Sequence, residues 1–114
     1  MNNATRATTE TGLIVKSGTW LYDGCVPHEV WIVRQNFDYF HDAGYEDAPE
    51  KLNDNGELFQ VLVARDGAVL SVVPASHSIE EAIAKAHQKI PQKIEWDDHR
   101  LQPLFGGRNY RLSE

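Results

Sequence analysis

The chain has 114 residues, of which 41% are hydrophobic and 25% charged, a size and composition typical of one folded globular domain. Its net charge of -6 argues against nucleic acid and anionic membrane surfaces as partners. The lone Cys25 excludes an internal disulfide. The sequence has no secretion signal, so we expect a cytoplasmic protein. It has no run of ~20 apolar residues, so we expect no membrane segment.

The two ends of the chain differ from its middle in composition. Residues 1–12 are rich in Thr and Asn, and we expect them to form a disordered tail. Residues 13–98 are expected to form a single domain. Residues 99–114 combine Pro, Gly and large apolar residues without a clear period, which predicts a C-terminal tail that packs on this domain or on a second subunit.

The first two strands are expected to form a hairpin. One strand reads LIVKSGTWLYDG (13–24), is rich in β-branched and aromatic residues, and is interrupted at Ser17 and Gly18. It ends on the turn pair Asp23-Gly24. The second strand reads EVWIVRQNF (29–37) and follows after Pro27.

The polar segment DYFHDAGYEDAPEKLNDNG (38–56) is too long for a hairpin loop. We expect it to leave the sheet and to contain one short helical turn that ends at Gly44, because glycine favours the backbone conformation at a helix C-terminus.

The clearest strand pattern is ELFQVLVARDGAVLSVVP (57–74), in which Asp66-Gly67 separates two apolar runs and predicts a type I′ turn. Such a turn places Val63 opposite Leu70 and Val61 opposite Val72. Both faces of this hairpin are then largely apolar. We therefore expect it to lie centrally in the sheet with a cover on each face. The C-terminal tail, the acidic excursion or a second subunit could supply the second cover, and we favour a homodimer.

A helix is predicted over 79–90. Ser78 and Glu81 match the capping box of a helix start, Ile79, Ala82, Ile83, Ala86 and Ile90 share one helical face, and Pro91 ends the helix. A last strand follows in QKIEWDD (92–98), with Ile94 and Trp96 pointing inward. The predicted fold is α+β: a mainly antiparallel sheet of about five strands in the order ββββαβ, with one helix packed on a face.

The first candidate site is the acidic excursion, residues 38–57, in which seven acidic residues face one lysine. Its residue order does not fit a calcium loop. Aromatic rings offer anchoring area, and carboxylates steer an encounter with a basic protein. We therefore predict that this segment forms a surface for a cationic protein partner. The alternative is that it is a solvated loop without a binding role. The predicted surface residues are Phe37, Tyr39, Phe40, Asp42, Tyr45, Glu46 and Asp47.

A second hypothesis is a small-molecule pocket, enclosed by a curled sheet and lined by Trp20, Trp31 and Trp96, with His28 or His99 as the polar group. Cys25 and His28 have the spacing of one edge of a zinc site, but no second ligand pair accompanies them, and we expect no metal and no cofactor. The same pair lacks a third group that would orient a catalytic base. With no phosphate loop and no hydrolase motif, we expect a binding protein rather than an enzyme.

The arrangement of two hairpins, the acidic segment FDYFHDAGYEDAPEKLNDNGE (37–57) and one capped helix resembles small, acidic, uncharacterised bacterial proteins of mobile gene cassettes, and toxin-neutralising immunity proteins. The resemblance covers residues 13–98. It rests on no diagnostic residue and carries no active site across. It implies a small bacterial accessory or immunity-type module that binds another protein.

Overall fold

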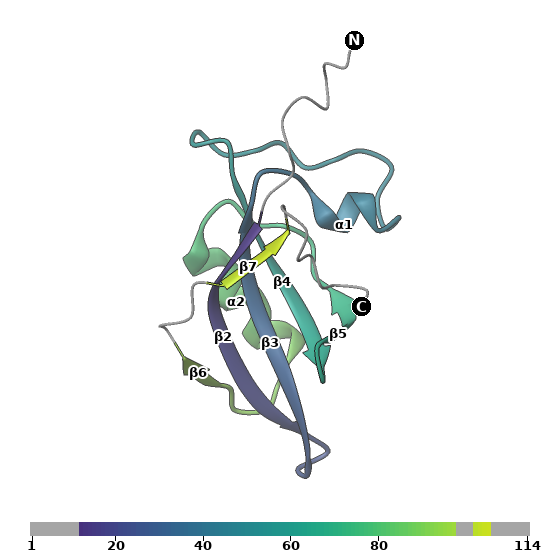
Figure 1. Cartoon of the computed structure of the whole chain (residues 1–114), viewed down its shortest axis with the longest axis vertical. Coiled ribbons are helices and arrows are strands. Elements are labelled where there is room, and N and C mark those ends of the chain that lie inside the picture. Colours follow the sequence, from purple (N-terminus) through teal and green to yellow (C-terminus); the bar gives the residue numbers. More distant parts are fainter. Residues whose placement is uncertain (1–11, 98–101, 106–114) are drawn as a thin grey trace.

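Six antiparallel strands and two helices make up the computed structural model, which describes residues 12–97 and 102–105 (Figure 1). The elements are β2 (Gly12–Tyr22), β3 (Val26–Gln35), α1 (Tyr39–Asp42), β4 (Leu58–Arg65), β5 (Ala68–Val72), α2 (Ile79–Lys89), β6 (Glu95–Asp97) and β7 (Gln102–Phe105). The strand order is β5-β4-β3-β2-β6, and β7 also pairs with β2. The predicted α+β fold, an antiparallel sheet with one main helix on a face, is confirmed.

The β2–β3 hairpin runs along most of the long axis, with its turn at one end and α1 at the other (Figure 1). The predicted interruption at Ser17 and Gly18 is wrong, because β2 continues through both residues. Gly18 instead permits the close approach of β6. A Cβ atom at this position would lie 2.7 Å from Cγ2 of Ile94 and 3.0 Å from Cε3 of Trp96.

The turn between β4 and β5 has the predicted conformation. Asp66 and Gly67 have φ angles of 53° and 83°, and Arg65 pairs with Ala68 directly beside them. Positive φ at both central residues defines the type I′ turn that matches the twist of the strands.

A bulge at Leu70 shifts the register of the rest of this hairpin. Val63 pairs with Ser71 instead of Leu70. Because one residue is added on the β5 side, Val72 turns to the sheet face opposite to that of Val61, and the predicted pairing of these two residues is wrong. The side chain of Leu70 is 54% exposed.

Helix α2 packs against β3 and β4, and its start is fixed by two side chains. The hydroxyl of Ser78 accepts the N–H of Glu81 at 3.1 Å, as the capping box predicts. The carboxylate of Glu81, however, accepts the N–H of His77 at 3.0 Å, one residue before the expected partner. Neither α1 nor α2, the helices of the described residues, is long and apolar enough to cross a membrane.

The predicted central position of the β4–β5 hairpin is wrong, because β5 forms an edge of the sheet. Both faces of the sheet are nevertheless apolar, to different extents. On one face lies the helix-side core, whose buried residues are Trp20, Val30, Ile32, Val61, Val63, Val73, Ala82, Ala86, Ile90 and Ile94. The opposite face carries the second-face cluster, with buried Ile14, Val33 and Leu62 and partly buried Trp31, Phe37, Tyr39, Val69 and Val72. Phe37 and Tyr39 come from the chain that leaves β3, so this chain covers part of the second face.

Residues 1–11, 98–101 and 106–114 lie outside the described residues. They include most of the predicted N-terminal and C-terminal tails, and also His99. Of the predicted C-terminal tail, β7 is described. It pairs with the first residues of β2, from Gly12 to Ile14.

Candidate functional site

The acidic excursion is attached to the sheet through the buried side chain of Gln60, in the middle of β4. Its Oε1 atom accepts the N–H groups of Tyr39 and Phe40 at 3.1 and 3.3 Å, and also the amide of Gln35. Its Nε2 atom donates to the carbonyl of Val73 at 2.7 Å. The first N–H groups of a helix have no partner within the helix. Here the sheet supplies that partner, which fixes the position of α1.

Asp38 is the second anchor of the excursion and is only 6% exposed. One carboxylate oxygen accepts the N–H of His41 at 3.2 Å, as the N-cap of α1. The other accepts the N–H of Glu50 at 2.8 Å. A single side chain therefore joins the start of α1 to the far side of the excursion. His41 adds a local contact, since its Nδ1 atom lies 3.0 Å from the carbonyl oxygen of Glu46.

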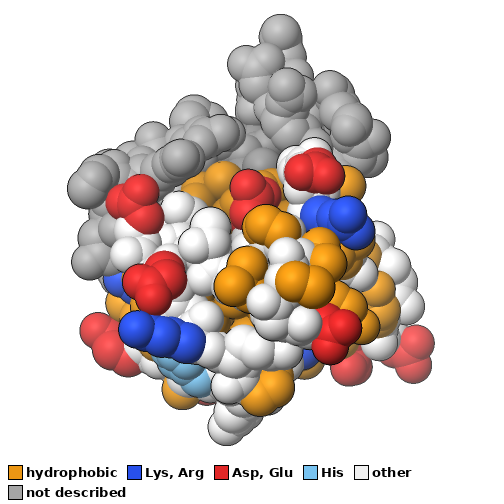
Figure 2. Space-filling view, turned by 90° about the horizontal axis from the view of Figure 1, so that it is seen from below, with side chains coloured by type: hydrophobic (Ala, Val, Ile, Leu, Met, Phe, Trp, Pro, Cys, Tyr) orange, Lys and Arg blue, Asp and Glu red, His pale blue; other side chains and the backbone are white. Residues whose placement is uncertain are grey.

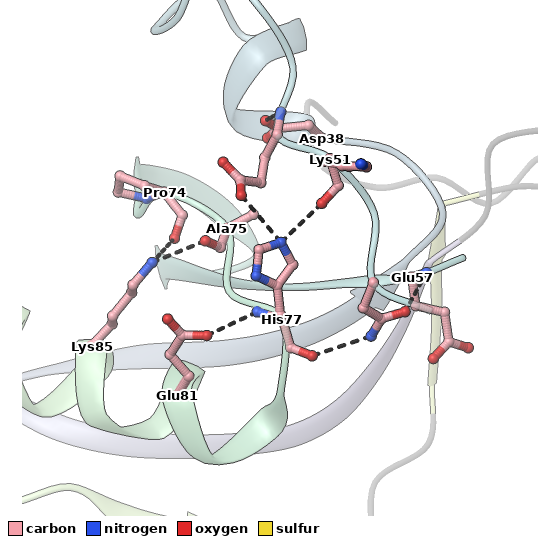
Figure 3. A network of polar contacts seen from close by, with 10 residues as sticks. Asp38, Lys51, Glu57, Pro74, Ala75, His77, Glu81 and Lys85 are labelled. Carbon is pink, nitrogen blue, oxygen red and sulfur yellow. Dashed lines mark hydrogen bonds and ion pairs between the residues drawn. The ribbon is translucent and has the colours of Figure 1, made fainter. Parts of the chain in front are cut away.

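His77 is the third anchor and joins the excursion to the chain before α2 (Figure 3). Its Nε2 atom lies 2.9 Å from the carbonyl oxygen of Lys51 and 3.1 Å from a carboxylate oxygen of Glu50. The amide of Asn53 donates to the carbonyl of His77 at 3.1 Å. Three anchors from separate parts of the chain thus hold the excursion in one conformation.

The seven residues of the predicted partner surface divide into two groups. Phe37 and Tyr39 pack against the second-face cluster and point toward the sheet. The other five form the outward-facing set, which consists of Phe40, Asp42, Tyr45, Glu46 and Asp47. Within it, the rings of Phe40 and Tyr45 stack with their centroids 4.9 Å apart, Tyr45 is 57% exposed, and the three acidic residues are exposed.

A hollow of about 460 Å³ lies beside this set. Its lining residues include the acidic Asp42 and Glu50, the apolar Phe37 and Leu52, and one lysine, Lys51. Carboxylates beside an aromatic ring suit the charged end and the aliphatic stem of a basic side chain. Within residues 12–97, no group of three or more His, Cys, Asp and Glu residues is arranged to hold a metal ion.

The residues of the alternative pocket come together only in part. Trp20 belongs to the helix-side core and Trp96 packs against it, whereas Trp31 lies on the second face. His28 is buried, with its ring centroid 4.9 Å from that of Trp20. Cys25, by contrast, is exposed in the turn, so Cys25 and His28 lie in different environments.

The structure instead forms a cavity of about 560 Å³, called here the turn cavity, between the β2–β3 turn and the chain that follows α2. Trp20, Leu21 and Pro27 line it from the hairpin, and Gln92, Lys93 and Glu95 line it from the other side. The sequence pattern identified Trp20 and missed the rest, because the two walls meet only through the pairing of β2 with β6.

Comparison of the chain with known protein families, with curated protein sequences and with solved structures finds no match. The functional argument therefore rests on geometry. Of the anchors, Gln60 had a visible sequence signal, since a single amide within an apolar strand has to find hydrogen-bond partners when buried. The anchoring role of His77 had no visible sequence signal, because its partners lie about two dozen residues earlier in the chain.

Proposed function

We propose that the protein is a small, non-enzymatic binding module of the bacterial cytoplasm that recognises a cationic protein through the acidic excursion. The observation that supports this proposal is the outward-facing set, which presents a stacked aromatic pair and three exposed carboxylates on an anchored scaffold. A surface that is ordered before binding loses less conformational entropy when the partner docks.

Charge and shape favour a basic partner. Seven of the 17 acidic residues of the chain lie in the excursion, against one lysine. The field of such a surface steers a cationic protein toward it and raises the association rate. In the proposed complex, a Lys or Arg side chain of the partner enters the hollow and pairs with Asp42 and Glu50, while Tyr45 packs on the partner surface.

The test compares two triple variants with the same change in net charge. One neutralises the excursion through Asp42→Asn, Glu46→Gln and Asp47→Asn. The control neutralises exposed acids elsewhere, through Asp66→Asn, Glu80→Gln and Glu95→Gln. Proteins captured from bacterial lysate by each bait are identified by mass spectrometry. We expect a basic protein that the wild type and the control retain and the excursion variant loses; identical capture by both variants would refute the proposal.

A homodimer is part of the proposal. Trp31, Val69 and Val72 are only partly buried on the second face, and β5 forms an edge of the sheet. Apolar surface of this kind favours association with a second copy. Sedimentation equilibrium is expected to give twice the chain mass of 12.9 kDa, and a mass of one chain would show that this part of the proposal is wrong.

A further inference from the structure

The two edges of the sheet differ in the described residues. The outer edge of β2 is paired by β6 and β7, whereas no strand of the described residues lies beyond β5. Edge strands that stay unpaired are commonly protected by charged residues, prolines or bulges. β5 has the bulge at Leu70, but its sequence AVLSV (68–72) contains no charged residue and no proline. This edge is therefore open to pairing with a further strand.

The pairing with β4 shows which backbone groups of β5 point to this edge. Successive residues of an antiparallel strand direct their N–H and C=O groups alternately toward and away from the neighbouring strand. Val73 points toward β4, because its N–H donates to the carbonyl of Val61 at 3.0 Å, so Val72 points away. At the other end of β5, Ala68 closes the two-residue turn and points toward β4, so Val69 points away.

The same two residues carry apolar side chains on the second face. Val69 and Val72 are only partly buried there, in the cluster that contains Trp31. Leu70, between them, is 54% exposed. A strand that pairs with β5 would remove part of this apolar surface from water, which is favourable.

We infer that the proposed homodimer forms through β5, which pairs with β5 of a second copy in antiparallel orientation and continues the sheet across the dimer. Val69 of each copy exchanges hydrogen bonds with Val72 of the other, and the two-fold axis passes between Leu70 and Ser71. This inference rests on the homodimer of the proposed function and specifies its interface.

Charges at the two ends of β5 favour a second copy in this orientation. Asp66, in the turn before β5, has a 92% exposed side chain and only a long contact, 3.9 Å, with the neighbouring Arg65. Beyond the other end of β5, Lys85 donates to the carbonyl of Ala75 at 2.9 Å. Antiparallel pairing places the turn of each copy beside that end of the other. Each Asp66 then approaches Lys85 of the partner copy, an attraction that offsets part of the repulsion between two chains of net charge -6.

The first test is Leu70→Lys, with the dissociation constant of the dimer measured by sedimentation. Position 70 lies next to the proposed axis, so the two copies would bring like charges together. Like charges on paired strands repel each other, and a lysine on an edge strand opposes pairing, so we expect the dissociation constant to rise by about tenfold or more. Because Leu70 is exposed, we expect the single chain to keep its fold.

The matched control is Leu21→Lys. Hydrophobic side chains also gather at the end of the molecule that carries the β2–β3 turn, which faces the viewer in Figure 2. Leu21 is 49% exposed, similar to Leu70, but it lies on β2, which β3 and β4 separate from β5. We expect this variant to leave the dissociation constant unchanged.

The second measurement is amide hydrogen exchange of the wild type at concentrations above and below the dissociation constant. The N–H groups of Val69 and Val72 are expected to exchange slowly in the dimer and fast in the single chain. Val73 is the internal control. Its N–H is bonded to Val61 within the chain, so it should exchange slowly at both concentrations.

The outcomes separate this inference from the proposed function. If a dimer forms but the two lysine variants affect it equally, or if Val69 and Val72 exchange as fast in the dimer as in the single chain, the β5 interface is wrong and the homodimer stands. Loss of the dimer in Leu21→Lys alone would place the interface at the β2–β3 turn and also overturn the inference. A mass of one chain at every concentration refutes the homodimer and this interface together, while the acidic excursion is tested separately by partner capture.

Discussion

At the end of the molecule that carries α1, buried polar side chains are largely paired, whereas at the β2–β3 turn several are not. Gln60 and Asp38 use both of their polar atoms to hold the excursion. Oε1 of Gln35 and Oγ of Ser76, which pairs with Phe59 at the start of β4, are the exceptions there. Around the turn cavity, by contrast, Trp20 and Gln92 each retain an unpaired atom. At the first end the paired side chains hold the excursion on the sheet, whereas the atoms left unpaired around the turn hold no segment in place.

The largest effect is expected from Gln60→Leu. The replacement has a similar size but leaves two N–H groups of α1, the amide of Gln35 and the carbonyl of Val73 without their partner. We expect the free energy of unfolding to fall by about 4 kcal/mol, because each buried group left unpaired costs about 1 to 3 kcal/mol and the structure relaxes in part. Urea denaturation measures the change.

The control for this variant is Gln88→Leu, at an exposed position of α2. It is expected to change the free energy of unfolding by less than about 0.5 kcal/mol. If Gln60→Leu cost no more than this control, the anchoring role of Gln60, and with it the contrast between the two ends, would be wrong.

Asp38→Ala is expected to have the next largest effect, about 2 kcal/mol, because it removes a helix cap and a second buried hydrogen bond. The N–H of Glu50 loses its partner, so its hydrogen exchange should accelerate relative to amides of β4. The exposed neighbour Asp47→Ala is the control and should leave both quantities nearly unchanged. Equal exchange at Glu50 in the two variants would show that Asp38 does not hold the excursion.

His77→Ala is expected to cost about 1 kcal/mol, since its contacts are half-exposed. Its main consequence should be local. Limited proteolysis is expected to cut between Lys51 and Asn53 faster than in the wild type, while cleavage elsewhere stays the same. An unchanged cleavage rate in this segment would remove His77 from the anchors.

The smallest effect is expected at the other end, from Trp20→Phe. The indole N–H has no partner to lose, so only packing changes, and the free energy of unfolding should fall by less than about 1 kcal/mol. A loss as large as that of Gln60→Leu, measured in the same urea experiment, would mean that the two ends do not differ in the way described above.

The elements with local signals were predictable from the sequence. The turn at Asp66-Gly67, the cap Ser78 and the helix that follows it were all expected and are present. The bulge at Leu70 was not. When both faces of a hairpin are apolar, a shift of one residue leaves the hydrophobic pattern almost unchanged, so the pattern does not define the register.

The candidate sites were predictable only in part. An alternation of aromatic and acidic residues in a loop does not show which rings turn inward, and Phe37 and Tyr39 do so because the second face offers them apolar contacts. The two walls of the turn cavity come from segments far apart in the chain. Their approach depends on the glycine at position 18, which the sequence suggested only as a break in the strand.

One consequence of the topology concerns the order in which the chain is synthesised. In the described residues, the outer edge of β2 is paired by β6 and β7, the last strands to be made, although β2 itself is the first. Until those strands emerge from the ribosome, the nascent chain carries an open edge that invites pairing with other chains. Contacts this distant in sequence also form late during refolding. A protein of this design depends on β6 and β7 to protect β2, the first strand of its described residues.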